Sequence, residues 1–250
     1  MLVLVTDLDG TFLGGTPEQF SELAERLAAM GDDARLVYCS GRARHKILPL
    51  IDSGRLPRPD AIIGDVGTSL WDGHGEVLSH PVTTAIAERW GDGRSRVEAA
   101  LATVPDLLPQ AGCGPNRMSY TYTHIDAVAT ATPIVEAMGF DALVSDGVYF
   151  DVLPKGINKG ATVLALIRLW ALAPEHVVVA GDTLNDLSMF HTGLPGVVVG
   201  NAEPALLAAL PPRLPTYRAR AHGAGGILEG LRHFGHLPSP TTASGEPPHV

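Results

Sequence analysis

The chain has 250 residues, of which 45% are hydrophobic and 18% are charged, and it carries a formal net charge of -9. The negative charge argues against a nucleic acid or an anionic membrane surface as the main partner. Two cysteines without CxxC or Cys/His spacing exclude a disulfide framework and a cysteine metal site.

The N-terminus does not have the pattern of a secretory signal, because no basic residue precedes the short apolar run at 2–5 and acidic residues follow it directly. The longest apolar stretch, 161–173, contains Arg168 and is too short to span a bilayer. We therefore expect a cytoplasmic protein without membrane contact. Its length suffices for one large domain or for a domain with an insertion.

Short apolar runs alternate with amphipathic helical patterns in the first and last parts of the chain. The first strand, 2–5, precedes a helix that begins after Thr16, has Pro17 as its first residue, uses Gln19 in a capping box and ends at Gly31. Further strands are expected at 35–39, 61–64, 176–180 and 197–199, and further helices from about 43 and over 159–172. This alternation predicts the α/β class: a Rossmann-like, doubly wound parallel sheet with helices on both faces.

The middle of the chain breaks this rhythm. It shows a hairpin at 71–78, helices at 84–90, 94–103 and 133–139, and strands at 118–123 and 148–153. We therefore predict an inserted α+β domain over 81–154, between two parts of the core at 1–80 and 155–235. The tail, 236–250, is rich in Pro, Ser, Thr and Gly and is expected to be disordered.

Two pairs of acidic residues directly follow predicted strands. Asp7 and Asp9 come after the first strand, and Asp182 and Asp186 come after 176–180. Solvated turns, or acids at a helix start, would explain either pair alone, and an EF-hand loop fails because Phe12 stands where that loop needs Gly. The carboxyl ends of parallel strands meet at one edge, where such sheets bind ligands. Four carboxylates gathered there need a cation, and their hard oxygen atoms suit Mg²⁺.

Positive charge and hydrogen-bond donors follow two other predicted elements. Ser40, Gly41 and Arg42 follow the second strand, where a plain turn before a helix is the alternative interpretation. Lys159 begins the helix after the insert, where a solvated surface lysine is the alternative. A lysine at a helix start is unfavourable with respect to the helix dipole, so Lys159 is expected to point at an anion.

In combination these segments resemble a known family. Asp-x-Asp-Gly-Thr, Ser-Gly-Arg, Lys and Gly-Asp-x-x-x-Asp occur in the order found in the haloacid dehalogenase (HAD) superfamily of phosphohydrolases. The insert has the position of the large α+β cap of the Cof-type, or IIB, branch. The segments 65–71, 116–120, 151–156 and 226–231 look like those of sucrose-phosphate phosphatases and their bacterial relatives. One departure is Asp65, where the resemblance leads us to expect Ser or Asn.

The resemblance implies a reaction and roles for the core residues. Asp7 is the expected nucleophile, which forms an aspartyl phosphate, and Asp9 is the expected acid and then base. Mg²⁺ is expected on Asp7, the backbone carbonyl of Asp9 and Asp182, with Asp186 bound directly or through water. Ser40 and Lys159 are expected to contact the phosphoryl oxygens.

The implied substrate is a small sugar phosphate such as sucrose 6-phosphate. The alternative is that the protein is a mannosylfructose-phosphate or mannosyl-3-phosphoglycerate phosphatase, since these enzymes share the architecture. Substrate contacts are expected from Gly41, Arg42 and Asn185 in the core and from Arg117 and Lys155 at the insert. Further candidates are Gln110, Asn116, Tyr120, Arg44 and His45, although packing in the cap sheet is preferred for Tyr120 and a solvated position for His45.

Two other function classes compete with a phosphatase. A sugar phosphomutase would also use the second acid, Asp9, and would show a requirement for a bisphosphate. A catalytically silent binding module would not need all of the catalytic residue types of the family, and this sequence contains them all. Dehalogenation is disfavoured because that chemistry does not use an acid at this position. The oligomeric state is not implied by the sequence.

Overall fold

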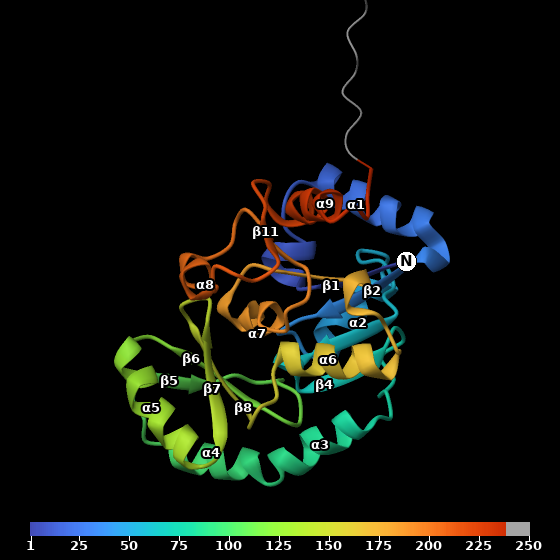
Figure 1. Ribbon diagram of the computed structural model, residues 1–250. Coiled ribbons are helices and arrows are strands. Elements are labelled where there is room, and N and C mark those ends of the chain that lie inside the picture. Colours follow the sequence, from blue (N-terminus) through green and yellow to red (C-terminus); the bar gives the residue numbers. More distant parts are fainter. Residues whose placement is uncertain (239–250) are drawn as a thin grey trace, which may run out of the picture.

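The computed structural model describes residues 1–238 and contains a seven-stranded sheet (Figure 1). Its strand order is β11-β10-β9-β1-β2-β3-β4, and all neighbours are parallel except β3 and β4. The strands are β1 (Leu2–Thr6), β2 (Ala34–Cys39), β3 (Ala61–Gly64), β4 (Ser69–Asp72), β9 (Val177–Gly181), β10 (Gly196–Val198) and β11 (Thr216–Arg218). The predicted parallel α/β core is confirmed.

Helices cover both faces of this sheet. On one face lie α1 (Pro17–Met30), α2 (Arg44–Asp52) and α9 (Gly223–His233), and on the other lie α6 (Lys159–Leu169), α7 (Leu187–Phe190) and α8 (Pro204–Ala209). Figure 1 shows α1 and α9 on the side of the sheet opposite to α6. Each face of the buried strands contributes to its own apolar cluster, as the near-continuous apolar strands require. Short helical turns occur at Leu8–Phe12, Gly31–Asp33, Asp65–Gly67, Pro174–His176 and Leu184–Asp186.

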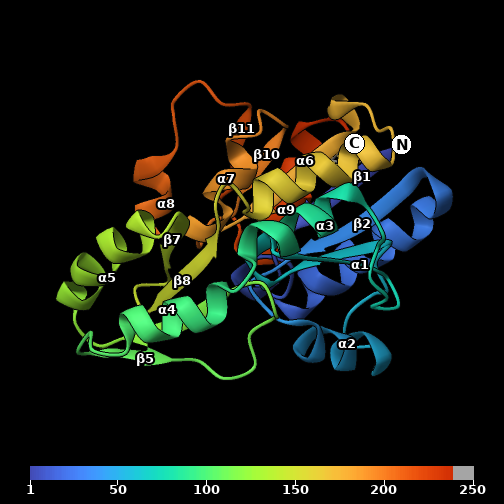
Figure 2. The ribbon, with the colours of Figure 1, turned by 90° about the horizontal axis from the view of Figure 1, so that it is seen from below.

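A second, antiparallel sheet of order β5-β6-β8-β7 lies in the segment 81–154. Its strands are β5 (Leu107–Pro109), β6 (Met118–Tyr122), β7 (Phe140–Ser145) and β8 (Tyr149–Pro154), accompanied by α3 (Pro81–Trp90), α4 (Gly93–Leu101) and α5 (Ile125–Ala137) (Figure 2). Side chains from these helices and strands form a third apolar cluster. We keep 81–154 as the proposed cap, and the seven-stranded unit as the core.

Details of the cap and tail differ from the sequence interpretation. The helix expected at 133–139 begins at Ile125 and includes Pro133. Proline removes one helical hydrogen bond, but Ala127, Ala131 and Val135, at helical spacing, bury one side of α5 against the cap. Strand β7 was not predicted.

The first residues of the predicted tail pack against the core. Leu237 joins an apolar cluster, while 239–250 lie outside the described residues. Within 1–238, no helix combines the length and apolar character needed to cross a membrane.

Candidate active site

The register of the central strands brings the predicted residues to one edge of the core sheet. Thr6, the last residue of β1, lies beside Tyr38 of β2 and Ala180 of β9. Asp7, Ser40 and Asp182 follow directly on the ends of these strands. From β1 the chain continues to β2 on one side of β1, whereas β9 lies on the other side of β1. The strand order therefore reverses between β1 and β9, and parallel sheets form a ligand-binding crevice at the carboxyl ends of the strands at such a point.

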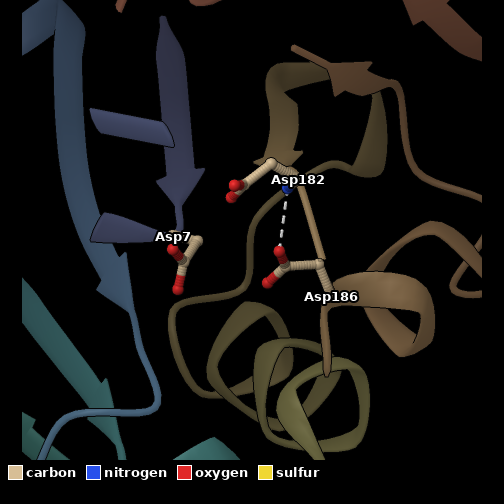
Figure 3. A group of neighbouring side chains, drawn as sticks. All are labelled: Asp7, Asp182 and Asp186. Atoms are coloured by element: carbon tan, nitrogen blue, oxygen red, sulfur yellow. Dashed lines mark hydrogen bonds between the residues drawn. The ribbon is translucent and has the colours of Figure 1, made fainter. Parts of the chain in front are cut away.

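Three carboxylates, those of Asp7, Asp182 and Asp186 (Figure 3), form the centre of the site together with one ammonium group. Lys159 Nζ donates to Asp7 Oδ1 at 2.7 Å and to Asp186 Oδ1 at 2.6 Å, and the lysine is fully buried. Asp186 Oδ2 accepts from the backbone N–H of Asp182 at 2.9 Å and of Thr183 at 3.1 Å. Lys159 therefore points inward at anions, and the solvated-lysine alternative is wrong.

Asp182 is held at the edge by two side chains. Thr11 Oγ1 donates to Asp182 Oδ1 at 2.6 Å, and Asn201 Nδ2 lies 3.4 Å from its Oδ2. Burial, and then the neighbouring Asp186, raise the pKa of the Asp182 carboxyl to about 7. Asn201 was not predicted, although it follows the end of β10 and thus obeys the same rule as Asp182.

The charges of this cluster fit a divalent cation. Burial raises the pKa of Asp7 well above its ordinary range, although Lys159 opposes this effect. Burial lowers the pKa of Lys159, but Asp186 and Asp7 together raise it by more. Oxygen atoms of Asp7, Asp182 and Asp186 all lie within 4.8 Å of one another. When all three carboxyl groups are ionised, one ammonium group leaves two negative charges in excess, and hard oxygen ligands suit Mg²⁺.

Asp9 and Arg42 lie beside this centre as a pair. Arg42 Nε donates to Asp9 Oδ2 at 2.7 Å and Arg42 Nη2 donates to Oδ1 at 2.5 Å, while 60% of the Asp9 side chain is exposed. The buried Ser40 Oγ accepts from the Arg42 backbone N–H at 3.1 Å. The Asp9 carboxylate is thus outside the three-acid cluster, and Arg42 is occupied by Asp9.

A cavity of about 360 Å³ lies over this edge, between core and cap. Its core lining includes the predicted Asp7, Asp9, Gly41, Arg42, Asp182 and Asn185, together with Gly10, Lys46, Val66 and Thr183. Its cap lining consists of Gln110, Arg117, Ser119, Ser145, Asp146, Tyr149 and Asp151. Polar groups from both units therefore face one space of the size of a small-ligand site.

Among the residues expected to bind substrate, Lys155 does not line the cavity. Its side chain is 66% exposed and its Nζ pairs with Asp141 Oδ1 at 2.6 Å. Asp141 lies on β7, beside the end of β8, and also accepts from the N–H of Gly156 at 2.7 Å. Lys155 is paired with Asp141 and is not among the residues that line the cavity, although it is close to Lys159 in sequence.

Arg117 lines the cavity but is held by protein groups. Its Nη1 donates to Asp151 Oδ1 at 3.2 Å, and its Nη2 donates to the carbonyl oxygen of Gly41 at 2.9 Å. Its Nε lies 3.4 Å from Asp65 Oδ1, without the alignment of a hydrogen bond. Both Nη atoms of Arg117 thus already donate to protein groups, although the residue borders the cavity.

Asn185 has the opposite character. Its side-chain oxygen is buried and has no hydrogen-bond partner among residues 1–238. A buried polar atom without a partner is costly, and this one belongs to a residue that lines the cavity. It fits a site that is completed by a hydrated cation or by a ligand hydroxyl group.

Asp146 is a cavity residue that sequence reasoning missed. It lies in the tight turn between β7 and β8, where Asp146 and Gly147 both have positive φ, at 53° and 62°. The Asp-Gly pair between two apolar runs is a hairpin signal, and it would have placed this turn. The position of Asp146 near the core edge depends on how the cap packs, and no local sequence pattern indicates it.

Comparison with known proteins identifies the family. A profile of the family described as sucrose-6F-phosphate phosphohydrolase matches residues 1–235. The chain is 41% identical over 240 residues to glucosylglycerol-phosphate synthase of Pseudomonas anguilliseptica, covering 94% of this chain but only 31% of that protein. It is 32% identical over 247 residues to mannosylfructose-phosphate phosphatase of Agrobacterium fabrum, covering 94% of this chain and 98% of that protein.

A solved structure agrees with this assignment. The sucrose-phosphatase of Synechocystis sp. PCC6803, determined with sucrose and phosphate, matches with a TM-score of 0.85 at 29% identity. The match covers 94% of this chain and 98% of that one. The chain therefore belongs to the sucrose-6F-phosphate phosphohydrolase family, whose sugar phosphatases are phosphoric monoester hydrolases of the HAD superfamily.

Proposed function

We propose that this protein hydrolyses a glycosyl phosphate, a sugar phosphate with a second polar unit, through an aspartyl phosphate on Asp7. The observation that carries the proposal is the cluster of Asp7, Lys159, Asp182 and Asp186, of which Asp7 and Asp182 line a polar cavity while Lys159 and Asp186 are buried beside them. A nucleophilic carboxylate, a buried cation and further hard oxygen ligands are the groups that phosphoryl transfer requires.

In the first step an oxygen of Asp7 attacks phosphorus while the bond from phosphorus to the sugar oxygen breaks. Lys159 Nζ donates to Asp7 Oδ1 and so orients the attacking carboxylate. The leaving sugar oxygen takes a proton from Asp9. In the second step a water molecule attacks the phosphorus, the bond to Asp7 breaks, and Asp9 accepts the proton of the water.

Asp9 can serve as the acid only when it is not held by both nitrogens of Arg42. We propose that the phosphate group of the substrate competes for this guanidinium, since arginine binds phosphate in the same bidentate manner as it binds carboxylate. Arg42 then binds the phosphate and Asp9 turns toward the leaving oxygen. Ser40 and the N–H of Gly41 are the proposed further donors to the phosphate.

The residues present fit Mg²⁺. Asp7, Asp182 and the backbone carbonyl of Asp9 would hold it, with Asp186 bound through water because both of its oxygen atoms already accept protein hydrogen bonds. The bound ion supplies positive charge that offsets the repulsion between the carboxylates and the phosphate.

We propose that cap residues recognise the sugar. Gln110, Ser145, Asp146 and Tyr149 bring amide, hydroxyl and carboxylate groups to the cavity, and such groups form the directional hydrogen bonds that distinguish sugars. Sucrose 6-phosphate and mannosylfructose phosphate are candidate substrates. The relative with 41% identity adds glucosylglycerol phosphate, a smaller glycoside.

The test is a phosphate-release screen of the purified protein with Mg²⁺ against these three esters, mannosyl-3-phosphoglycerate and simple hexose phosphates. We expect one glycosyl phosphate to exceed the simple hexose phosphates by at least roughly tenfold in kcat/KM, the value of one or two directional contacts. If a sugar phosphate is isomerised only in the presence of a bisphosphate, the protein is a phosphomutase. The absence of phosphate release from every ester would refute the proposal.

A further inference from the structure

A buried ionic contact joins the core to the cap beside the cavity. Asp65, on the core turn Asp65–Gly67, is 1% exposed, and its Oδ1 accepts from the N–H of Gly114 in the cap at 2.9 Å. The same oxygen lies 3.4 Å from Nε of Arg117, whose side chain is 8% exposed. Asp65 is also the position where the sequence resemblance led us to expect Ser or Asn, so the role of its carboxylate needs an explanation of its own.

The turn that carries Asp65 is strained and tightly bound to the phosphate side of the site. Asp65 and Val66 both have positive φ, at 52° and 58°, a conformation that aspartate adopts more readily than most residues but that is rare and strained for the β-branched Val66. The N–H groups of Asp65 and Val66 donate to the carbonyls of Arg42 and Ser40. These bonds fix the turn against the Ser40–Arg42 loop.

The turn also touches the helix that starts with Lys159. Thr162 Oγ1 donates to the carbonyl of Gly67 at 2.6 Å, and a Cβ on Gly67 would lie 2.3–2.5 Å from backbone atoms of Asn158 and Lys159. Asp65 therefore stands on a rigid piece of core that borders both the phosphate loop and the buried lysine. A cap group bound to Asp65 is held at a fixed distance from both.

Arg117 carries this contact back to the phosphate loop. It lies between two carboxylates, Asp65 in the core and Asp151 in the cap, and its Nη2 donates to the carbonyl of Gly41. Removing one partner of such a buried group leaves an uncompensated charge, which proteins tolerate poorly. Without Asp65, Arg117 keeps one carboxylate, and that carboxylate belongs to the cap itself.

We propose that Asp65 is a positioning residue that holds the cap closed over the cavity by binding Gly114 and Arg117. Asp65 itself is not among the residues that line the cavity. It sets the distance between the sugar-reading cap side chains and the phosphate-binding loop. This inference rests on the proposed function for its kinetic consequence, but not for its structural one.

The kinetic test compares two substrates. Asp65→Asn retains an acceptor for Gly114 but loses the charge that holds Arg117. It should raise KM for the preferred glycosyl phosphate by roughly tenfold, as the loss of one charged partner does, with kcat within about threefold. For an aryl phosphate, which presents no hydroxyl groups to the cap, both constants should stay within about threefold. Equal losses on both substrates would place Asp65 in phosphate chemistry or folding and overturn the proposal.

A matched control uses the same carboxylate. Ser69 Oγ donates to Asp65 Oδ2 at 3.1 Å within the core, so Ser69→Ala removes a core partner and leaves both cap contacts in place. It should leave the ratio of the two KM values unchanged. If Ser69→Ala shifts that ratio as strongly as Asp65→Asn, the effect comes from the turn and the proposal fails.

The structural test needs no substrate. Hydrogen exchange of the free protein, followed by mass spectrometry, should show at least roughly tenfold faster exchange around Gly114 in Asp65→Asn, because the cap opens more often. If this variant does not fold, Gly114→Ala provides the second probe, since a Cβ there would lie 2.3 Å from Asp65 Oδ2 and push the two units apart. Unchanged exchange around 114 in the folded variant would overturn the inference. A wild-type protein without phosphatase activity would refute the proposed function, and the exchange experiment would still decide this point.

Discussion

Lys155 and Lys159 are four residues apart and occupy opposite environments, so together they test the charge balance of the site. Lys159 is fully buried between Asp7 and Asp186, whereas 66% of the Lys155 side chain is exposed beside Asp141. Replacing each lysine by methionine keeps a long apolar side chain and removes only the ammonium group. The two variants therefore differ mainly in where the charge is lost.

The expected size of the effect follows from the contacts. In Lys159→Met, Asp186 keeps two backbone donors, but Asp7 loses the one cation bonded to it among residues 1–238. Removing one partner of a buried ion pair costs about 3–5 kcal/mol. For a chain of this length each kcal/mol lowers Tm by about 2–4 °C, so the melting temperature should fall by roughly 6–20 °C. Lys155→Met should change Tm little, because exposed pairs contribute almost nothing.

The assay is thermal unfolding by circular dichroism with and without Mg²⁺, together with phosphate release. Lys159→Met should lose at least roughly 10²–10³-fold in kcat, the usual effect of removing a donor that stabilises transition-state charge. Mg²⁺ should recover part of its lost Tm, because a cation returns positive charge to the acids. Lys155→Met should retain wild-type kcat and KM.

Two results would refute this reasoning. Equal melting temperatures for the two variants would show that the buried pairs of Lys159 do not balance the acidic cluster. A strong rise of KM in Lys155→Met would show that its position outside the cavity is not the one it has with substrate bound.

Three further predictions concern the nucleophile, the cap and the metal. Asp7→Asn should lose roughly 10⁴-fold or more in kcat with the circular dichroism spectrum unchanged; activity within tenfold of wild type would exclude Asp7 as nucleophile. Asp146→Asn should raise KM for the glycosyl phosphate by roughly five- to tenfold and KM for an aryl phosphate much less. The control is Asp141→Asn, because Asp141 lies on the same hairpin but does not line the cavity; equal effects of the two variants would remove Asp146 from sugar recognition. Because the pKa of Asp182 is raised to about 7, the folded metal-free protein binds a proton that the unfolded chain has lost, so its stability falls as the pH rises from about 4 to 7. Mg²⁺ competes with that proton and should raise Tm more at pH 8 than at pH 5 in calorimetry; an equal rise at both values would show that the metal does not bind Asp182.

The core of the site was predictable because its residues follow strands directly. In a parallel sheet the position after a strand is fixed in space once the strand order is known, and Asp7, Ser40 and Asp182 all occupy such positions. The buried position of Lys159 also followed from a local argument, since its charge opposes the helix dipole. Local chemistry and fold geometry point to the same place for these residues.

The cap was less predictable because its geometry depends on packing between units distant in sequence. Lys155 does not line the cavity and pairs instead with Asp141 of the neighbouring strand. Strand β7, which carries Asp141, follows α5 and had no clear pattern in the sequence. Asp146 reaches the cavity only because the hairpin β7–β8 is long enough to meet the core. Asp65 looked anomalous in sequence, and its partners, Gly114 and Arg117, lie 49 and 52 positions away.

The central claim is that Asp7 receives the phosphoryl group, and trapping the phosphorylated enzyme tests it most directly. Asp9→Asn should still expel an aryloxide, which needs no acid, but should lack the base for the second step. The variant is mixed with Mg²⁺ and an aryl phosphate, quenched in acid and reduced with borohydride. It should show the mass change of a reduced acyl phosphate at Asp7 alone, in the same amount as a single burst of the released phenol. A burst without modification at Asp7, or with modification at another residue, would contradict the account.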